Sequence, residues 1–482
     1  MNKHTFLFSF LLVFSLLGVA QNPFDTNDLK KHMYTLASDR FEGRLSGSEG
    51  GEMAAEYIRE EFKTAGLALL ADDGFQSFTF PQGKKMGGNT YLKVNNYVPK
   101  MGIEYATYVY SQNANTKPDI VFVGYGIEND IRNDYRNVDV KGKWILMISG
   151  KPDSEKFKDF TISQSKKIDN ARRKGVKGII MVDPASRNPK DTIISKQLNS
   201  IYFNVSVLQI KRSLCDSFLV ANDLQINKAI DWYSTTDTVL SRDLDVEFQY
   251  KSDIVSAESH GKNVIGLLEG SDPKLKEEYV VVGGHFDHLG VSEKNGVRNI
   301  YYGADDNASG TIGVMELAKH FAGQKERPKR SIIFITFDAE EKGLIGSNYF
   351  MKNLPQGISK SKIVAMVNLD MIGRYTDEEG LNIAGYNSSK EGESIINQLS
   401  KRTALKLSNN NKMFNSSDHV NFYVNDIPVF FFFTGLHADY HKPTDTPDKI
   451  DYGKMAEILS VAEELILDLT NRSKALKFRI IK

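Results

Sequence analysis

The fold of this chain is decided by the stretch Tyr279-Val280-Val281-Val282-Gly283-Gly284-His285-Phe286-Asp287-His288. Its run of β-branched residues, closed by two glycines, is typical of a buried strand. Such a strand carries a histidine and a carboxylate beyond its C-terminal end, which is where open α/β sheets bind their ligands. We therefore expect a site at the carboxyl edge of a sheet.

Three later runs also have the pattern of strands, and each is followed by side chains that can bind a metal. They are Ser331 to Phe337, followed by Glu340 and Glu341; Ile363 to Leu369, followed by Asp370; and Ile427 to Phe433, followed by a loop with His437, Asp439, Tyr440 and His441. Amphipathic helices are predicted between and after these strands, at Ser309 to Ala322 and Tyr452 to Asn471. This alternation is typical of a doubly wound α/β sheet whose strands end at one shared edge.

Composition limits the size and the partners of the protein. The chain has 482 residues, 41% of them hydrophobic and 25% charged, so it can bury large cores and is expected to form two domains. Lysine plus arginine and aspartate plus glutamate number 61 each. This balance gives no overall field that would favour nucleic acid or an anionic membrane.

Residues 1–20 are predicted to be a secretory signal. Lys3 precedes an apolar run from Phe6 to Leu17, and small residues precede Gln21. The run is short for a bilayer span, and an uncleaved anchor is the alternative. The single Cys215 cannot form an internal disulfide, and we interpret it as a small buried residue. The mature protein is expected to be secreted or periplasmic, without a membrane span.

The middle of the chain differs from its flanks. No histidine occurs from Tyr34 to Ser259, and this region shows short strand patterns with one clear helix at Ser163 to Lys174. We expect residues 21–86 and 251–482 to form one domain with the chemistry. Residues 87–250 are then a second domain inserted into it, and a single continuous domain is the alternative.

Several common catalytic motifs do not occur in the sequence. There is no His-Glu-x-x-His, Cys-x-x-Cys, Gly-x-Ser-x-Gly or phosphate-binding glycine motif. What remains is two histidines and three carboxylates, a mixture that suits two zinc or similar first-row ions with a shared carboxylate. Any one of these side chains alone would be an ordinary polar residue, but five of them after successive strands indicate a metal site. They are His285, Asp306, Glu341, Asp370 and His441.

Five motifs contain these residues: Gly-His285-Phe-Asp287, Gly-Ala-Asp-Asp306-Asn-Ala-Ser-Gly, Asp-Ala-Glu340-Glu341-Lys-Gly, Asn-Leu-Asp370-Met-Ile-Gly and Tyr440-His441-Lys-Pro-Thr-Asp445-Thr. Together they resemble the co-catalytic di-zinc exopeptidase family. That family includes secreted bacterial aminopeptidases, glutamate carboxypeptidase and, more distantly, glutaminyl cyclase and the transferrin receptor. The resemblance implies an α/β fold with a three-layer mixed sheet flanked by helices.

The inserted block has a weaker resemblance of its own. Phe122-Val123-Gly124-Tyr125-Gly126 and Val140-Lys141-Gly142-Lys143 are similar to stretches of the protease-associated domain, which many family members carry as an insertion. This resemblance implies a smaller, β-rich α+β domain at residues 87–250.

The family resemblance also implies a role for each ligand. His285 and Asp370 would bind one zinc ion, Glu341 and His441 would bind the other, and Asp306 would bridge the two. The cofactor is therefore expected to be two Zn²⁺ per chain.

Further roles follow from the same resemblance. Glu340 would be the general base that takes a proton from the attacking water and returns it to the leaving amine. Asp287 would orient His285, and Tyr440 would donate a hydrogen bond to the developing oxyanion. Ser417-Asp418-His419 would lie beside the substrate, or would only be a loop that caps a helix.

The function expected from these residues is that of a secreted metallo-exopeptidase acting on peptides, most simply an aminopeptidase. A carboxypeptidase is an alternative, for which Arg374 could bind a substrate carboxylate. Glutaminyl cyclisation uses one zinc ion in the family pattern, and a metal-free binding protein should have lost ligands. The full set of five ligands and a base favours the peptidase.

Overall fold

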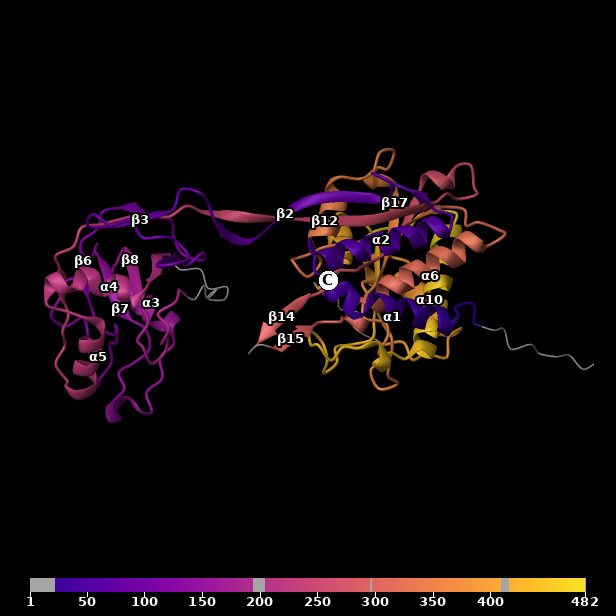
Figure 1. Ribbon diagram of the computed structural model, residues 1–482. Helices are drawn as coiled ribbons and strands as arrows, with labels where there is room; N and C mark the ends of the chain where they lie inside the picture. Colours follow the sequence, from indigo (N-terminus) through magenta and orange to yellow (C-terminus); the bar gives the residue numbers. More distant parts are fainter. Residues whose placement is uncertain (1–21, 194–203, 295–296, 409–415, 482) are drawn as a thin grey trace, which may run out of the picture. The chain divides into compact units, whose positions relative to one another are not determined.

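The computed structural model describes residues 22–193, 204–294, 297–408 and 416–481, which form two compact units (Figure 1). Unit 1 comprises the chain up to Phe80 and from Ser259 onward, and unit 2 is Pro81–Glu258. The predicted inserted block, 87–250, lies inside unit 2. The predicted signal, residues 1–20, lies outside the described residues.

Unit 1 is built on an eight-stranded mixed sheet in the order β1-β12-β16-β13-β17-β19-β18, with β2 paired to β12. The four central strands are mutually parallel, and β12 and β18 are antiparallel to their neighbours. The bounds are β1 Ala68–Leu69, β2 Phe75–Met86, β12 Ile254–Leu268, β13 Tyr279–His285, β16 Ser331–Phe337, β17 Ile363–Leu369, β18 Asn382–Ala384 and β19 Val429–Phe433.

Helices cover both faces of this sheet. Alternate strand residues point to opposite sides, so Val280 and Val282 of β13 join one core while Val281 joins another. The first core contains residues of α1 (Thr26–Leu36), α2 (Glu49–Thr64), α6 (Gly310–Gly323), α8 (Gly392–Leu399) and α10 (Tyr452–Asn471); the second contains residues of α7 (Ile345–Lys352) and α9 (His419–Tyr423). The predicted three-layer α/β fold with a mixed sheet is confirmed.

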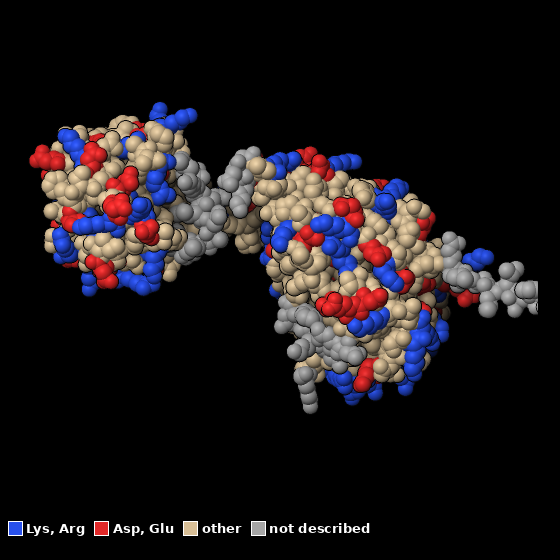
Figure 2. Space-filling model, turned by 90° about the horizontal axis from the view of Figure 1, so that it is seen from below, with Lys and Arg blue, Asp and Glu red and all other residues tan. Residues whose placement is uncertain are grey.

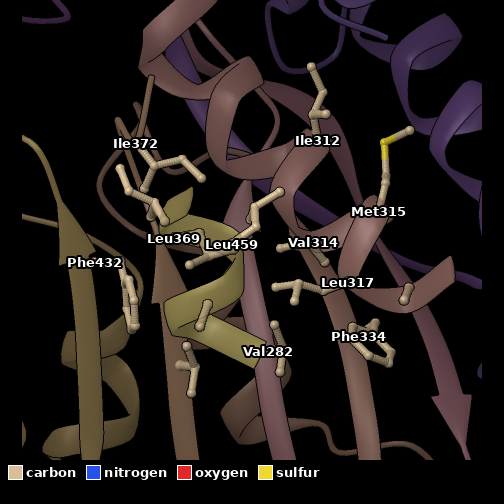
Figure 3. Packing of buried hydrophobic residues seen from close by; sticks show 14 of the residues in the cluster. Val282, Ile312, Val314, Met315, Leu317, Phe334, Leu369, Ile372, Phe432 and Leu459 are labelled. Carbon is tan, nitrogen blue, oxygen red and sulfur yellow. The ribbon is translucent and has the colours of Figure 1, made fainter. Parts of the chain in front are cut away.

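The first core brings the start of α6 close to the end of β17 (Figure 3). Val282 and Phe334 lie beside Leu317 of α6 and Leu459 of α10 in this core. Gly310, at the first position of α6, lies so close to the strand that an added Cβ would be 2.1 Å from the Leu369 carbonyl oxygen. Only glycine permits this approach, which places the loop before α6 next to the carboxyl end of β17.

The described residues of unit 2 form a six-stranded sheet in the order β10-β6-β7-β8-β9-β4, a three-stranded sheet β3-β11-β5 and three α-helices. The strands β6 to β9 are parallel, with helices packed on both faces. The bounds are β3 Tyr91–Val94, β4 Tyr105–Thr107, β5 Asn115–Thr116, β6 Ile120–Phe122, β7 Trp144–Ile148, β8 Gly178–Val182, β9 Ser206–Ile210, β10 Arg242–Leu244, β11 Phe248–Lys251, α3 Gln164–Arg173, α4 Arg212–Leu219 and α5 Ile226–Thr235.

Surface charge and the apolar character of the helices are two features that bear on contact with a membrane. On the face seen in Figure 2, basic and acidic side chains are interspersed, as the equal numbers of the two charges suggest. Within the described part of the chain, no helix combines the length and the apolar character that crossing a membrane requires.

Unit 2 buries one lysine completely. The Nζ of Lys167, on α3, donates to the carbonyl oxygens of Tyr125, Ile148 and Gly150 at 2.8, 2.9 and 2.9 Å. Burial lowers the pKa of this amine from 10.5 to about 7. Below this pH the buried amine is charged in the folded unit, and its desolvation lowers the stability of unit 2. This loss of stability is recovered as the pH rises and the folded unit releases the proton.

Unit 1 buries an arginine whose hydrogen bonds join distant segments. Arg44, in the loop between α1 and α2, donates to the carbonyl oxygens of Leu36, Phe286, Tyr302 and Gly303 at 2.7 to 2.8 Å. Phe286 follows the end of β13, and Gly303 begins the loop before α6. The side chain thus fixes two of the loops that border the carboxyl edge of the sheet.

We expect the stability of unit 2 to rise with pH between about 7 and about 10.5, because the unfolded chain still binds the Lys167 proton there and the folded unit does not. The contribution of Lys167 to the slope of the free energy of unfolding against pH approaches about 1.4 kcal/mol per pH unit. Lys167→Met removes it, so the variant should show a flatter slope. Both tryptophans, Trp144 and Trp232, belong to unit 2, so urea unfolding followed by tryptophan fluorescence reports this unit. Equal slopes in the two proteins would contradict the account.

Arg44→Met should destabilise unit 1 by at least about 3 kcal/mol, because it leaves four carbonyl oxygens without their donor. Arg40→Met is the matched control, since Arg40 lies in the same loop but is exposed, and should change stability by less than about 0.5 kcal/mol. Hydrogen exchange of the amides of α6 and β13 measures the effect in unit 1 alone. A similar, small effect of both changes would show that Arg44 does not hold these loops together.

Candidate metal centre

Acidic and imidazole side chains converge at the carboxyl edge of the unit 1 sheet. His285 is the last residue of β13, Asp370 follows β17, and the turn after β16 carries Glu340 and Glu341. Asp306 comes from the loop before α6. The parallel arrangement of these strands is what brings residues distant in the sequence to one edge.

One group of possible ligands consists of His285, Asp306 and Asp370, all of them buried. The Nε2 of His285 is 3.5 Å from Asp306 Oδ1 and 3.6 Å from Asp370 Oδ2. Three donor atoms at this spacing can surround a single small cation. These are the residues that the family resemblance assigned to the first ion.

A second group shares Asp306 and adds Glu341. The Nε2 of His441 is 3.1 Å from Asp306 Oδ2 and 3.3 Å from Glu341 Oε2. The Nδ1 of His288 also belongs to this group, at 2.9 Å from Glu341 Oε1 and 3.7 Å from Asp306 Oδ2. All five sequence-predicted ligands are thus brought together, and His288 joins them.

The loop that carries Asp306 is fixed by buried hydrogen bonds. The backbone amides of Asp305 and Asp306 donate to Asp445 Oδ2 at 2.9 and 3.1 Å. Asn307 Oδ1 accepts from the Gly310 amide that begins α6, and its Nδ2 donates to the Leu369 carbonyl at 3.0 Å. Asp306 is therefore presented to both groups by a loop that is tied to neighbouring segments on each side.

The Asp287 side chain lies between the glutamate turn and His285. Its carboxylate accepts hydrogen bonds from the backbone amides of Glu340 and Glu341, at 2.9 and 3.3 Å, and from the Ser46 hydroxyl at 3.1 Å. It lies 3.7 Å from the Nδ1 of His285, which is closer, at 3.1 Å, to the Asp287 carbonyl oxygen. Asp287 thus holds the glutamate turn with its side chain, and both its carbonyl oxygen and its carboxylate lie near the His285 ring.

The two adjacent glutamates have opposite electrostatic environments. Burial, together with the charges of Asp418 and Asp370, raises the pKa of Glu340 to about 10, and the charge of His285 opposes this rise. Burial would also raise the pKa of Glu341, but hydrogen bonds with His288 and His441 outweigh it and the pKa is lowered. Glu341 is therefore held as a carboxylate, whereas Glu340 is a group that can hold a proton.

The other predicted site residues lie around this cluster. Tyr440 is 37% exposed, and its ring stacks on that of His441 at a centroid distance of 3.9 Å. Asp418 is buried, and burial raises its pKa to about 7. Arg374 is paired with Asp439 at 3.2 Å. Of these three, Asp418 acts electrostatically on Glu340, and Tyr440 lies at the rim.

The donor set fits zinc. Nitrogen and carboxylate oxygen donors are the ligands that Zn²⁺ accepts, and a carboxylate between two groups suits a two-ion site. Asp306 and Asp370 are buried and Glu341 is partly buried beside Asp306, so without a cation their mutual repulsion and desolvation would be poorly compensated. His285 and Asp370 would hold one ion, Glu341 and His441 the other, and Asp306 would contribute an oxygen to each.

Sequence reasoning missed several residues that build the site. Arg44 and Ser46 belong to a polar, glycine-rich loop at residues 38–48, which the motifs of the site do not include. His288 was quoted in the deciding stretch without a role, although it follows His285 by three residues at the same strand end. His437, for which only a loop position was noted, lies 3.2 Å from Asp305. The one signal in the sequence for Arg44 is its charge, because a basic side chain can compensate the predicted acidic site.

Comparison with known proteins finds similarity in the part of the chain that carries the cluster. The model of Peptidase family M28 matches residues 263–466. A glutamate carboxypeptidase 2 homolog of Caenorhabditis elegans is 24% identical over 431 residues, and the match covers 74% of this chain and 52% of that protein. This chain therefore spans about half the length of that relative.

Two solved structures share the fold over nearly the whole chain. An aminopeptidase from Aneurinibacillus sp. strain AM-1 has a TM-score of 0.51 at 23% identity, covering 95% of this chain and 97% of the other. A zinc aminopeptidase from Bacillus subtilis has a TM-score of 0.53 at 18% identity, covering 95% and 99%. The unit that carries the site thus matches Peptidase family M28 over residues 263–466, which supports the resemblance to the di-zinc exopeptidase family, and the two structures share the fold of the chain.

Proposed function

We propose that this protein is a zinc-dependent aminopeptidase that uses two metal ions to hydrolyse the N-terminal peptide bond of peptides. The observation that carries the proposal is the contrast between Glu341, a carboxylate directed at the second ligand group, and Glu340, a neighbouring carboxyl with a raised pKa. A hydrolase needs both a ligand set and a separate group that moves a proton.

The chain's own residues perform most of the steps. Zinc, when bound, would polarise the scissile carbonyl and make water more acidic. Glu340 Oε2 lies 3.9 Å from His285 Nε2, beside the first ligand group, where it can take a proton from water and deliver it to the leaving amine. A nearby cation favours the carboxylate form of Glu340, which moves its pKa from about 10 toward the range useful for a base.

The pairing of Arg374 bears on which end of a peptide the site accepts. A carboxypeptidase needs a cation that is free to bind the carboxylate of its substrate. Arg374, the candidate for binding a substrate carboxylate, is already paired with Asp439. These observations favour aminopeptidase over carboxypeptidase activity. The fold family of the relatives also includes a named zinc aminopeptidase.

Two further parts of the proposal concern the rest of the chain. Export rests on the signal-like residues 1–20, and we propose a secreted or periplasmic enzyme. We also propose that unit 2 contains a protease-associated domain, on the strength of the motifs in residues 122–126 and 140–143. Unit 2 contains no histidine, so it supplies no imidazole to the ligand set.

Metal removal should abolish activity. Dialysis of the purified protein against a chelator is expected to stop hydrolysis of free-amine peptides, and zinc or cobalt should restore it, with about two ions per chain in the active protein. Peptides of the same sequence with a blocked N-terminus are the matched control and should not be cleaved. Full activity in a preparation free of transition metals would contradict the metal mechanism, and equal cleavage of blocked peptides would contradict aminopeptidase specificity.

The adjacent glutamates should respond differently to the same substitution. Glu340→Gln keeps size and hydrogen bonding but removes the proton acceptor, so both ions should stay bound while the rate falls by ~10²–10⁴-fold. Glu341→Gln weakens a ligand, so occupancy at one ion position should fall together with the rate.

Metal analysis and kcat for both variants distinguish these roles, and each variant is the control for the other. If Glu340→Gln loses metal and Glu341→Gln retains two ions, the assignment is reversed. If neither substitution changes rate or metal content, the cluster is not the active site.

A further inference from the structure

His288 is a buried histidine that is not among the five ligands taken from the family resemblance. It is fully buried, and its backbone amide donates to the Arg44 carbonyl oxygen at 3.2 Å. Its Nδ1 is 2.9 Å from Glu341 Oε1, which is an ordinary hydrogen-bond distance. The fully buried ring therefore contacts Glu341, a proposed ligand of the second ion.

The other ring nitrogen shows where the proton lies. The Nε2 of His288 is buried and has no hydrogen-bond partner within the described part of the chain. A proton on Nε2 would be a buried donor without an acceptor, which is among the costly arrangements in a protein interior, whereas a bare lone pair is tolerated better. The proton therefore belongs on Nδ1, from which it is donated to Glu341 Oε1.

This hydrogen bond completes the immobilisation of Glu341. Asp287 Oδ2 accepts from the Glu341 backbone amide at 3.3 Å, and His288 takes up the carboxylate oxygen Oε1. The remaining oxygen, Oε2, is the one that lies 3.3 Å from His441 Nε2. Glu341 is thus fixed at its backbone and at one oxygen, and presents the other to the second group.

We propose that His288 is a positioning residue that donates from Nδ1 to Glu341 and thereby makes Glu341 a ligand through one oxygen. The inference rests on the proposed metal centre. The proposal gives different roles to the two imidazoles near the second ion. His441, whose side chain is 36% exposed, is left to coordinate the ion, and the fully buried His288 holds the Glu341 carboxylate. Their rings meet edge to face with centroids 5.8 Å apart.

Two amide substitutions test which nitrogen acts. The amide nitrogen of asparagine can occupy the place of a histidine Nδ1, and that of glutamine the place of Nε2. His288→Asn should therefore keep the hydrogen bond to Glu341, and His288→Gln should lose it. His288→Leu removes both nitrogens, and His32→Leu is the control, because His32 is another buried histidine that contacts a carboxylate, Glu316, at 3.2 Å.

The readout is metal affinity of the full chain, titrated with Zn²⁺ and with Co²⁺ against a chromophoric chelator, together with the absorption spectrum of the Co²⁺ form. Wild type should give two dissociation constants. His288→Gln and His288→Leu should raise one of them by about 10–100-fold and leave the other unchanged, the usual effect of losing a residue that orients a ligand. His288→Asn should recover most of the affinity with a spectrum like that of wild type, and His32→Leu should change neither.

The alternative outcomes are distinct. If asparagine is no better than glutamine and the Co²⁺ spectrum of both indicates one nitrogen fewer, His288 is a metal ligand and the positioning role is wrong. If all variants bind two ions as wild type does, His288 has no role toward Glu341. A wild-type protein that binds no ion would instead overturn the proposed function itself.

Discussion

Several carboxylates lie together at one edge of the unit 1 sheet, and their negative charges repel one another. The rest of the site has to compensate this repulsion. Asp306, Glu341 and Asp370 are ligand candidates within a few ångströms of one another, and Asp287 and Glu340 lie beside them. Burying ionised groups is costly unless opposite charges or hydrogen bonds compensate them. The surrounding residues compensate part of this cost, and two divalent cations would compensate it most directly.

The protein's own compensation comes from several directions. Arg44, completely buried, lies close enough to Asp306, Asp445 and Asp287 for their charges to raise its pKa against the larger effect of burial, which lowers it to about 10. Backbone amides of the glutamate turn and of the Asp306 loop supply further positive dipoles. The N-terminal segment is therefore part of the site, although the family model matches only residues 263–466.

Local patterns in the sequence predicted the elements well. The strands at 331–337 and 363–369 and the helix at 452–471 have the predicted bounds, because β-branched runs and a regular apolar spacing are short-range signals. The Asp451 side chain, which accepts from the Lys454 amide at 2.9 Å, marks the start of that helix in the same local way. The convergence of the five candidate ligands followed from the parallel order of the strands.

What could not be predicted depends on contacts between distant residues. Arg44 reaches carbonyl oxygens 242 to 259 residues away, and His288 meets a glutamate 53 residues away. No spacing rule connects such pairs. Unit 2 also extends a few residues beyond the predicted block at each end, because β2 and β12 each run from one unit into the other.

The central claim is that this cluster is a two-ion site built on Asp306. Anomalous diffraction at the zinc edge, from crystals of the zinc-loaded protein, tests it most directly. The account predicts two peaks separated by ~3.5–4 Å, one beside His285 and Asp370, the other beside Glu341 and His441, with Asp306 between them. A single peak, or peaks away from Asp306, would contradict it.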